Sequence, residues 1–357
     1  MQQQSEKKEG PLNILVVRVG AMGDVLHAMP AVAALRAALP DARIGWAIEP
    51  KWAPLLRGYG MTFDRGIAMP LVDAVHEVPT KSWSKEPLSF RTLWSVLAVR
   101  HELRMGNYDL VIDLQGSIRS GLIARMSGAR RIVGSATPRE RQASWFYTTK
   151  VSTERANVVE QAAEIVSAAV GRSLQPTPAP LPLSLPAEEW CDDLFEDIVQ
   201  HPIVLIAPTA GWGAKEWPAV RFGHLARELF DRGCTVLINA SPDSVDPTAS
   251  MVVACAQGRC RAVHCTLPEL MALVERVDLV IAGDTGPLHL AAAAGVPALG
   301  LYGPTDPARN GPWGPQSQVI RHRLSRTDHR RFKRTEPGLA EITVEEVLAA
   351  ALELLRG

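Results

Sequence analysis

Residues 13–39 read NILVVRVGAMGDVLHAMPAVAALRAAL, and this stretch decides the fold. Asn13–Val17 is a short apolar run typical of a buried strand, and Gly20–Gly23 supplies a turn. A helix is expected from about Val25 to Leu39. The alternation continues, with strands predicted at 44–48, 110–114 and 131–133 and a helix at 90–105 that has Arg and Glu on its polar face. Short strands that alternate with helices predict a parallel α/β sheet.

A proline-rich segment divides the chain. Residues 171–186 read GRSLQPTPAPLPLSLP, with five prolines in sixteen residues. Because proline removes amide donors and disfavours helix before it, this segment is predicted to be an extended linker. Beyond it the alternation restarts. Strands are expected at 203–207, 235–239, 279–282 and 297–302, and helices at 219–232, 268–277, 287–294 and from Thr343 to about Leu355.

The predicted architecture is α/β, with two doubly wound, Rossmann-like domains facing a central cleft. The expected parts are an N-terminal domain at 1–170, the linker at 171–186, a C-terminal domain at 187–335 and a C-terminal helix at 336–357. In such sheets ligands bind beyond the carboxyl ends of the strands, where the strand order reverses. The loops that follow the strands are therefore the candidate site.

Composition argues against several classes of protein. The 357 residues carry 38 Lys and Arg against 38 Asp and Glu, so the net charge is zero and does not suit a whole-chain polyanion binder. Five scattered cysteines without a CxxC pair disfavour a disulfide scaffold or a zinc ribbon, and fit a reducing compartment. No apolar run reaches ~18 residues, so no membrane span is expected.

Charge is nevertheless uneven along the chain. Residues 81–150 contain twelve Lys or Arg against five Asp or Glu, and Trp83 stands between Lys81 and Lys85. This mixture suits an anionic amphiphile, although a solvated helical face explains part of it. A second basic cluster, from Arg321 to Arg334, is either a contact for anionic lipid headgroups or an ordinary surface stretch.

The loop after the first strand, residues 18–24, is the first candidate for catalysis. Its two glycines allow a sharp turn and a close approach to a ligand. Asp24 stands at the expected start of a helix, where the helix dipole stabilises negative charge. An ionised carboxylate in a cleft can take a proton from an attacking hydroxyl, as a general base does. The alternative is that Asp24 only caps the helix.

Three loops of the second half are further candidates. Asp284-Thr-Gly-Pro-Leu-His289 follows a strand and opens a helix, so its free amides and hydroxyl suit a diphosphate; the alternative is a cap with a packed His289. Lys215, in a glycine-containing loop, suits a phosphate oxygen, and is otherwise a solvated surface lysine. Residues 303–307, GPTDP, are expected to form only a rigid turn at the cleft edge.

Five stretches together resemble one enzyme family. They are VRVGAMGDVLHAMPA, YDLVIDLQGSIRSG, PTAGWGAKEWP, DTGPLHLAAAAGVP and LYGPTDP, between about residues 12 and 316. They are similar to glycosyltransferase family 9, the ADP-heptose:lipopolysaccharide heptosyltransferases of GT-B fold. The resemblance implies an inverting transfer of heptose from ADP-L-glycero-D-manno-heptose to the Kdo of Kdo–lipid A. Within this family the sequence resembles the heptosyltransferase I subtype in three stretches, namely KSWSK at 81–85, PRE at 138–140 and ASWFY at 143–147.

The resemblance also implies roles for single residues. Asp24 matches the general base, and Lys215 matches a lysine that contacts the donor diphosphate. The nucleotide sugar would be held by Thr209, Lys215, Asp284, Thr285, Gly286 and His289. The acceptor's phosphate and carboxylate groups would be held by Lys81, Lys85 and Arg139, which places acceptor binding in the N-terminal domain and donor binding in the C-terminal one.

Departures from the family pattern leave alternatives open. Where the family often has an acidic residue beside the ribose, this chain reads ASPDS, in which Asp243 can substitute. The loop around Lys215 is more similar to the heptosyltransferase II form. The alternatives are therefore heptosyltransferase II, another nucleotide-sugar transferase of this fold, and a non-catalytic nucleotide-binding module. A dehydrogenase is disfavoured because Gly20–Gly23 is not GxGxxG.

No cofactor is expected, and a divalent cation is not obligatory, because Asp-x-Asp is absent from the motif loops and the histidines show no ligand spacing. The expected partners are ADP-heptose and Kdo–lipid A, with no nucleic acid. The protein is expected to be a cytoplasmic monomer that contacts the inner membrane peripherally at its cytoplasmic face.

Overall fold

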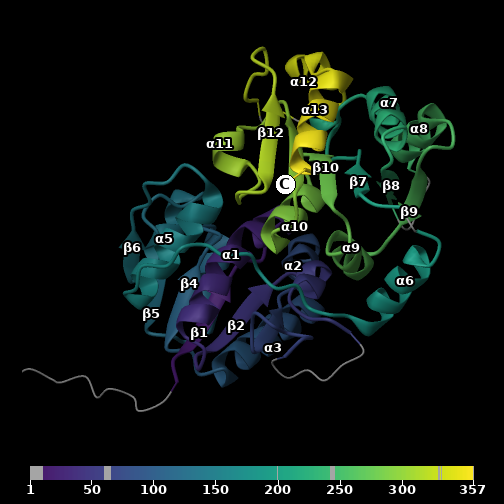
Figure 1. Ribbon diagram of the computed structural model, residues 1–357. Helices are drawn as coiled ribbons and strands as arrows, with labels where there is room; N and C mark the ends of the chain where they lie inside the picture. Colours follow the sequence, from purple (N-terminus) through teal and green to yellow (C-terminus); the bar gives the residue numbers. More distant parts are fainter. Residues whose placement is uncertain are drawn as a thin grey trace, which may run out of the picture.

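The computed structural model describes residues 11–59, 66–198, 200–241, 246–328, 330 and 332–356. These residues form two six-stranded parallel sheets, each flanked by helices, that stand one above the other in Figure 1. The first sheet is built from residues 13–151 and the second from residues 203–321. A GT-B arrangement of two doubly wound sheets is therefore confirmed.

The first sheet has the strand order β3-β2-β1-β4-β5-β6, and all of its strand pairs are parallel. Its strands are β1 (Asn13–Val17), β2 (Arg43–Ile48), β3 (Ala74–Glu77), β4 (Leu110–Asp113), β5 (Arg131–Ser135) and β6 (Thr149–Val151). Strand order reverses at β1, which pairs with both β2 and β4. The carboxyl ends of β1 and β4 therefore lie side by side at the position where doubly wound sheets bind ligands.

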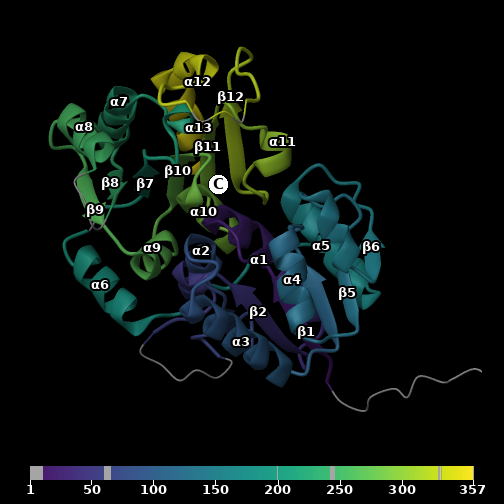
Figure 2. The same ribbon diagram turned by 180° about the vertical axis from the view of Figure 1, so that it is seen from behind.

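Helices cover both faces of this sheet. The helices α1 (Met22–Ala38) and α5 (Val158–Val170) pack against each other on one face. The opposite face carries α2 (Thr80–Lys85), α3 (Phe90–Met105), α4 (Ile118–Met126) and the 3-10 helix η2 (Arg141–Phe146); α2, α3 and α4 are visible in Figure 2. A further 3-10 helix, η1 (Pro50–Leu55), follows β2.

The second sheet repeats this plan with the order β12-β11-β10-β7-β8-β9. Its strands are β7 (Ile203–Ala207), β8 (Thr235–Ala240), β9 (Arg261–His264), β10 (Leu279–Gly283), β11 (Ala298–Tyr302) and β12 (Ser317–Arg321). Around it lie η3 (Gly213–Lys215), α7 (Ala219–Phe230), α8 (Pro247–Ala256), α9 (Leu267–Val274), α10 (Gly286–Ala294), α11 (Pro307–Asn310), α12 (Pro337–Glu341) and α13 (Val344–Leu354). The helix α13 packs against α7, β10 and β11.

The proline-rich segment lies between the halves, and residues 173–184 form neither helix nor strand. The Thr177 amide donates to the Pro30 carbonyl of α1, and the Ala179 amide donates to the Ala293 carbonyl of α10. The segment ends earlier than expected. Helix α6 (Leu185–Phe195) begins before the predicted boundary at residue 186, with Pro186 in its first turn, where a missing amide donor costs nothing.

The two halves share one apolar core where α1 packs on α10. This core includes Leu26 and Met29 of α1 and Leu288 and Leu290 of α10, all of them buried. The second half has an additional core of its own around Trp217 and Phe222. Among the described residues no helix is both long and apolar enough to cross a bilayer, and all five cysteines have free thiols.

The strongly apolar strands predicted from sequence are confirmed, and four strands were missed. The missed strands are β3, β6, β9 and β12, which occupy the outermost positions of the two sheets. Their residues are half polar and only partly buried, for example ThrLysVal in β6, so they lack the continuous apolar run that marks a central strand. Each outermost strand has only one neighbour, which explains the weaker signal.

The Arg and Glu residues of α3 are exposed, as predicted, but the exposed side of this helix also carries a run of apolar side chains that was not predicted. Phe90, Leu93, Trp94 and Leu97 are all exposed, and they follow each other at helical spacing on the side away from the buried Val99 and Leu103. The arginines of α3 flank this apolar stripe instead of forming a separate face. The helix thus has two apolar sides, of which only one packs on its own sheet.

Candidate active site

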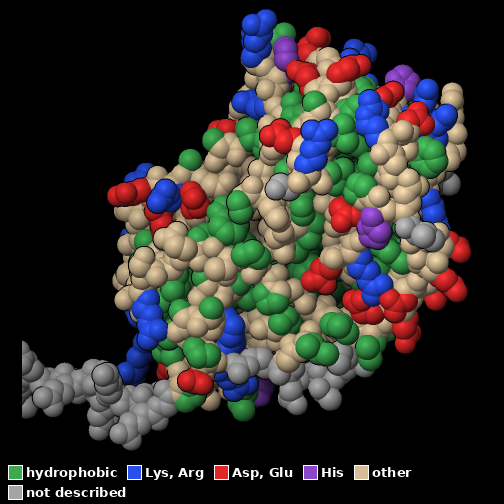
Figure 3. Space-filling view, viewed as in Figure 1, with side chains coloured by type: hydrophobic (Ala, Val, Ile, Leu, Met, Phe, Trp, Pro, Cys, Tyr) green, Lys and Arg blue, Asp and Glu red, His purple; other side chains and the backbone are tan. Residues whose placement is uncertain are grey.

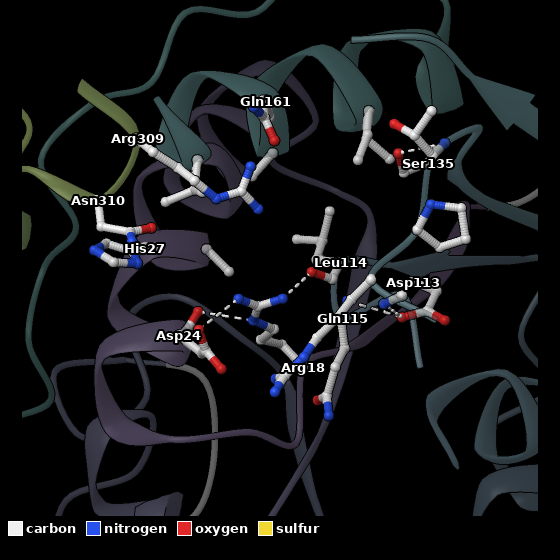
Figure 4. A pocket seen from close by; sticks show the side chains of 18 residues that line it. Arg18, Asp24, His27, Asp113, Leu114, Gln115, Ser135, Gln161, Arg309 and Asn310 are labelled. Atoms are coloured by element: carbon white, nitrogen blue, oxygen red, sulfur yellow. Dashed lines mark hydrogen bonds and ion pairs between the residues drawn. The ribbon is translucent and has the colours of Figure 1, made fainter. Parts of the chain in front are cut away.

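A cavity of about 640 Å³ opens at the carboxyl ends of β1, β4 and β5, and it is closed on one side by α5 and α11. Arg18 and Asp24 come from the loop after β1 and from the start of α1, and Gln115 follows β4. Arg309 and Asn310 enter from α11 of the second half (Figure 4). Both halves of the molecule therefore contribute to this cavity.

Asp24 lies in the first turn of α1 and faces this cavity. The helix begins after Ala21, and its N-terminus has no side-chain cap, so the alternative that Asp24 merely caps the helix is wrong. One carboxylate oxygen, Oδ1, forms an ion pair with Arg18 at 3.0 Å. Arg18 also donates to the Asp24 and Leu114 carbonyls, which fixes the pair. The other oxygen, Oδ2, has no hydrogen-bond partner among the described residues, and the side chain is 37% exposed.

The loop beneath Asp24 is held by side chains that follow β4. The Gln115 Oε1 accepts hydrogen bonds from the amides of Val19 at 2.7 Å and Gly20 at 3.0 Å. A Cβ atom on Gly20 would come within 3.0 Å of Asp24 Oδ2, so glycine keeps this oxygen accessible. Asp113 is buried, and this burial raises the pKa of its carboxyl group. The Gln115 amide and the Ser120 and Tyr147 hydroxyls donate hydrogen bonds to the carboxylate, and these bonds only partly oppose the rise. Asp113 therefore supports the loop.

A second cluster gathers around Asp284 in the other half. Its Oδ2 lies 2.5 Å from Lys215 Nζ, and its Oδ1 lies 2.8 Å from His289 Nε2. Burial would raise the pKa of Asp284, but the hydrogen bond from His289 and the charge of Lys215 outweigh it and hold the pKa well below its ordinary value. Lys215 is only 18% exposed and is therefore not a solvated surface lysine.

His27 connects the two clusters. It lies one turn after Asp24 on α1, and its Nε2 is 3.1 Å from His289 Nδ1. Burial, together with His289 and Arg18, holds the pKa of His27 well below 6.5, so its ring is neutral at physiological pH. Because the Asp284 carboxylate only accepts, His289 Nε2 donates to it, while Nδ1 of the same ring shares a hydrogen bond with His27 Nε2.

The start of α10 is built to receive a polar group. Thr285 holds the N-cap position, but its side chain makes no capping bond, and its Oγ1 is buried without a hydrogen-bond partner among the described residues. The first turn of a helix also has amide donors without intrahelical partners. Gly286 allows α1 and α10 to approach, because a Cβ there would come within 2.5 Å of the Met22 sulfur. A buried hydroxyl beside a helix N-terminus suits an anionic ligand.

The remaining predicted residues are dispersed. Arg139 lines the cavity with Asp24, whereas Lys81 and Lys85 lie exposed on α2, outside its lining. Thr209 follows β7 and is partly buried. The 303–307 loop is the expected turn, since Asp306 caps α11 through the Ala308 amide. Asp243 lies outside the described residues.

Sequence reasoning missed four functional candidates: Arg18, His27, Gln115 and Arg309. Two signals were available, since His27 follows Asp24 by three positions and therefore shares its helix face, and Gln115 directly follows a buried strand. Arg18 is inside the quoted loop, but its ion pair with Asp24 depends on how the loop folds. Arg309 reaches the cavity only because the two halves face each other.

Two parallel doubly wound sheets carry two polar clusters. Asp24, with one oxygen free of partners among the described residues, lines the cavity of the first half, and Lys215 and the N-terminus of α10 lie in the second half, connected to it by the contact between His27 and His289. This combination is typical of a glycosyltransferase of GT-B fold. The chain belongs to glycosyltransferase family 9 (heptosyltransferase), whose family model matches residues 96–339.

The chain is also similar to individual heptosyltransferases. Lipopolysaccharide heptosyltransferase 1 of Escherichia coli K12 is 29% identical over 320 residues, which cover 87% of this chain and 93% of the relative. The Pseudomonas aeruginosa protein of the same name is 28% identical over 318 residues, covering 86% and 83%. The structure of E. coli heptosyltransferase WaaC with ADP superposes with a TM-score of 0.77 at 25% identity, covering 96% of this chain and all of that one.

Proposed function

We propose that the protein transfers heptose from ADP-L-glycero-D-manno-heptose to the Kdo of Kdo–lipid A, with inversion at the anomeric carbon. The observation that carries this proposal is the free Oδ2 of Asp24, which faces a cavity between the two halves. The names of the relatives at 28–29% identity and the ADP bound to WaaC support the choice of donor and acceptor.

The acceptor step assigned to Asp24 is a proton transfer coupled to bond formation. Asp24 Oδ2 takes the proton of the acceptor hydroxyl as the hydroxyl oxygen attacks the anomeric carbon. The bond between that carbon and the diphosphate oxygen breaks, and its electron pair leaves with ADP. Arg18 keeps Oδ1 in place, so Oδ2 is the oxygen aimed at the substrate.

The departing diphosphate gains negative charge, and the second half supplies partners for it. Lys215, Thr285 Oγ1 and the amides at the start of α10 are the groups assigned to this charge. Asp284 and His289 hold Lys215 and the loop in position through the contacts described above. Gly286 and Thr209 complete the assigned donor site. Closure of the halves around the linker would exclude water from the reaction.

The acceptor carries carboxylate and phosphate groups, and basic side chains lead to the cavity. Arg139 lines it directly, and Arg309 extends into it from α11 (Figure 4). Lys81 and Lys85 on α2 are assigned to more distant anionic groups of the acceptor, since they are exposed outside the lining. We also propose that the enzyme works as a monomer, without an obligatory metal ion, at the cytoplasmic face of the inner membrane.

The transferase is tested by a matrix of donors and acceptors. Purified protein is incubated with ADP-heptose or other ADP-sugars, and with either Kdo–lipid A or an acceptor that already carries one heptose, and products are identified by mass. The proposal expects product only from ADP-heptose with Kdo–lipid A. Product only from the heptosylated acceptor would instead identify heptosyltransferase II, the alternative suggested by the loop around Lys215.

A Lys215→Ala variant tests the donor site. Affinity for ADP, measured by calorimetry, should fall by about 10–100-fold, because a charge-assisted contact to phosphate is lost. Lys215→Arg should recover part of it. Unchanged affinity in Lys215→Ala would remove this residue from the donor site.

A further inference from the structure

Exposed apolar side chains gather on one part of the molecule. Nine of the nineteen large hydrophobic side chains that are exposed among the described residues lie between Leu88 and Trp145, about a sixth of the chain. Leu88 is 99% exposed, Trp145 78% and Phe90 73%. Large contiguous apolar patches are uncommon on soluble proteins and mark interaction sites.

The exposed side of α3 is the centre of this area. Phe90 and Trp94 touch edge to face, with ring centroids 5.9 Å apart, and Leu97 lies on the same side of the helix. The opposite side buries Val99 and Leu103 in the core of the first half. Because the sheet already covers one apolar side of α3, the stripe of Phe90, Trp94 and Leu97 is available for a partner.

Neighbouring elements extend this stripe into one surface. Trp83 Nε1 of α2 donates to Ser95 Oγ of α3 at 2.9 Å, and Arg119 of α4 donates to Thr80 Oγ1 of α2 at 3.1 Å. The helix α4 packs on η2, where a Cβ on Gly121 would come within 2.4 Å of the Phe146 ring. We call the exposed side chains Leu88, Phe90, Trp94, Leu97, Leu122 and Trp145 the α3–α4 surface.

The surface is surrounded by positive charge. Arginines and lysines of α2, α3, α4 and η2 are exposed around it, namely Lys85, Arg91, Arg100, Arg104, Arg125 and Arg141. Within the described ranges of these four elements the one acidic residue is Glu102, which is bound to His76 at 2.5 Å. Acidic side chains gather instead over α6, at the lower right of Figure 3. Aromatic rings framed by Arg and Lys are typical of protein surfaces that contact anionic bilayers.

The α3–α4 surface is continuous with the candidate active site. A second pocket, of about 510 Å³, is lined by Ile118, Arg119 and Leu122 of α4, and it shares Gln115 and Arg139 with the cavity that contains Asp24. A molecule anchored at α4 can therefore reach Asp24 along a path lined by Arg139. This geometry fits an acceptor whose apolar part stays outside the protein.

We propose that the α3–α4 surface docks on a bilayer containing anionic lipids and so presents the Asp24 cavity to acceptors anchored there. This inference rests on the proposed function for the nature of the acceptor, but the docking itself does not. The basic cluster from Arg321 to Arg334 lies near α12, at the opposite end of the molecule from α3 in both views (Figures 1 and 2). Two of its arginines are engaged internally, Arg321 with Gly303 and Arg330 with Asp328.

Vesicle sedimentation tests this docking. Full-length protein is mixed with vesicles of phosphatidylethanolamine and phosphatidylglycerol, or with neutral phosphatidylcholine vesicles. Wild type should sediment with the anionic vesicles, and high salt should weaken this binding. Phe90→Ser/Trp94→Ser should lower the affinity by roughly tenfold or more, because each side chain loses its apolar contact with the bilayer.

Matched variants separate this surface from the rest of the molecule. Phe230→Ser removes an exposed aromatic from α7 of the other half and should leave sedimentation unchanged. Arg323→Glu/Arg326→Glu tests the opposite basic cluster; a loss there with no loss in Phe90→Ser/Trp94→Ser would overturn the proposal. It would equally be overturned if the Phe90→Ser/Trp94→Ser variant sedimented normally but changed its oligomeric state, since the surface would then be a contact between copies.

Activity provides an independent readout. Phe90→Ser/Trp94→Ser should transfer heptose normally to a soluble, deacylated acceptor and at least several-fold more slowly to the same acceptor in vesicles. If wild type transferred no heptose to any acceptor while the variant still lost vesicle binding, the proposed reaction would fail and the docking surface would stand. Equal slowing on both acceptors would contradict a role in docking.

Discussion

The imidazole of His27 on α1 meets that of His289 on α10, with Nε2 of the first 3.1 Å from Nδ1 of the second. The two residues are 262 positions apart, and their contact joins the half that carries Asp24 to the half that carries Lys215. His27, His289, Asp284 and Lys215 thereby form one hydrogen-bonded chain that crosses from the first half to the second.

The first prediction concerns pH and His27. The pKa of this residue is held below 6.5 in the folded protein, so the unfolded chain binds more protons between the folded pKa and about 6.5. The free energy of unfolding therefore contains the full contribution of a neutral His27 above about pH 6.5, and this contribution is lost as the pH falls below 6.5. Thermal unfolding from pH 5 to 8 should show a shallower dependence on pH in His27→Gln than in wild type. An identical dependence in both proteins would contradict the assignment.

The second prediction concerns Asp284, which is buried between Lys215 and His289. Asp284→Ala leaves the lysine charge without its partner, and the free energy of unfolding at pH 7 should fall by about 3 kcal/mol. Its depressed pKa means that this contribution is present above about pH 4 and is lost on acidification through the folded pKa. Glu228→Gln removes a half-exposed pair with Arg232 and is the control; denaturation should detect almost no change there. Similar losses in both variants would contradict the account.

The third prediction uses two threonines whose hydroxyl oxygens are buried and have no partner among the described residues, Thr285 and Thr305. Thr285→Val should weaken ADP binding by about fivefold, the value of one typical hydrogen bond, without lowering stability. Thr305→Val should leave both ADP affinity and stability unchanged. The affinity of both variants for ADP is measured by calorimetry. If Thr285→Val bound ADP as tightly as Thr305→Val, the nucleotide would not contact Thr285.

The fourth prediction concerns metal ions. No group of three or more His, Cys, Asp or Glu suitable for a metal occurs in the described part of the chain. Because Lys215 and the N-terminus of α10 are assigned to the leaving-group charge, turnover in excess EDTA should remain within about threefold of the rate with Mg²⁺. A loss of activity that added Mg²⁺ restores would show that a metal ion is required.

The strands that could be predicted from the sequence are the ones that are most deeply buried. β1, β4, β7, β10 and β11 are continuous apolar runs buried in the middle of the sheets, and sequence alone predicted them. The strands at the outer positions, such as β3 and β12, are paired on one side and partly exposed, so their sequences carry no such run. The apolar stripe on the exposed side of α3 was not predicted, because the Arg and Glu residues of this helix indicated only a polar face.

The candidate site divides in a similar way. Asp24, Lys215 and the 284–289 loop lie in the segments that follow predicted strands, so sequence reasoning could find them. The pairing of Arg18 with Asp24, and of His27 with His289, depends on loop conformation and on contact between the halves. No local pattern encodes such contacts, and only the folded chain reveals them.

Asp24 acts as the base in the proposed heptosyl transfer, and no other residue is assigned this step. The most direct measurement is the initial rate at which wild type and Asp24→Asn convert Kdo–lipid A to its heptosylated product with ADP-heptose, followed by mass. Wild type should form the product, and Asp24→Asn should be slower by about 10²–10⁴-fold while binding ADP normally. Absence of product with wild type, or a near-normal rate in Asp24→Asn, would contradict the account.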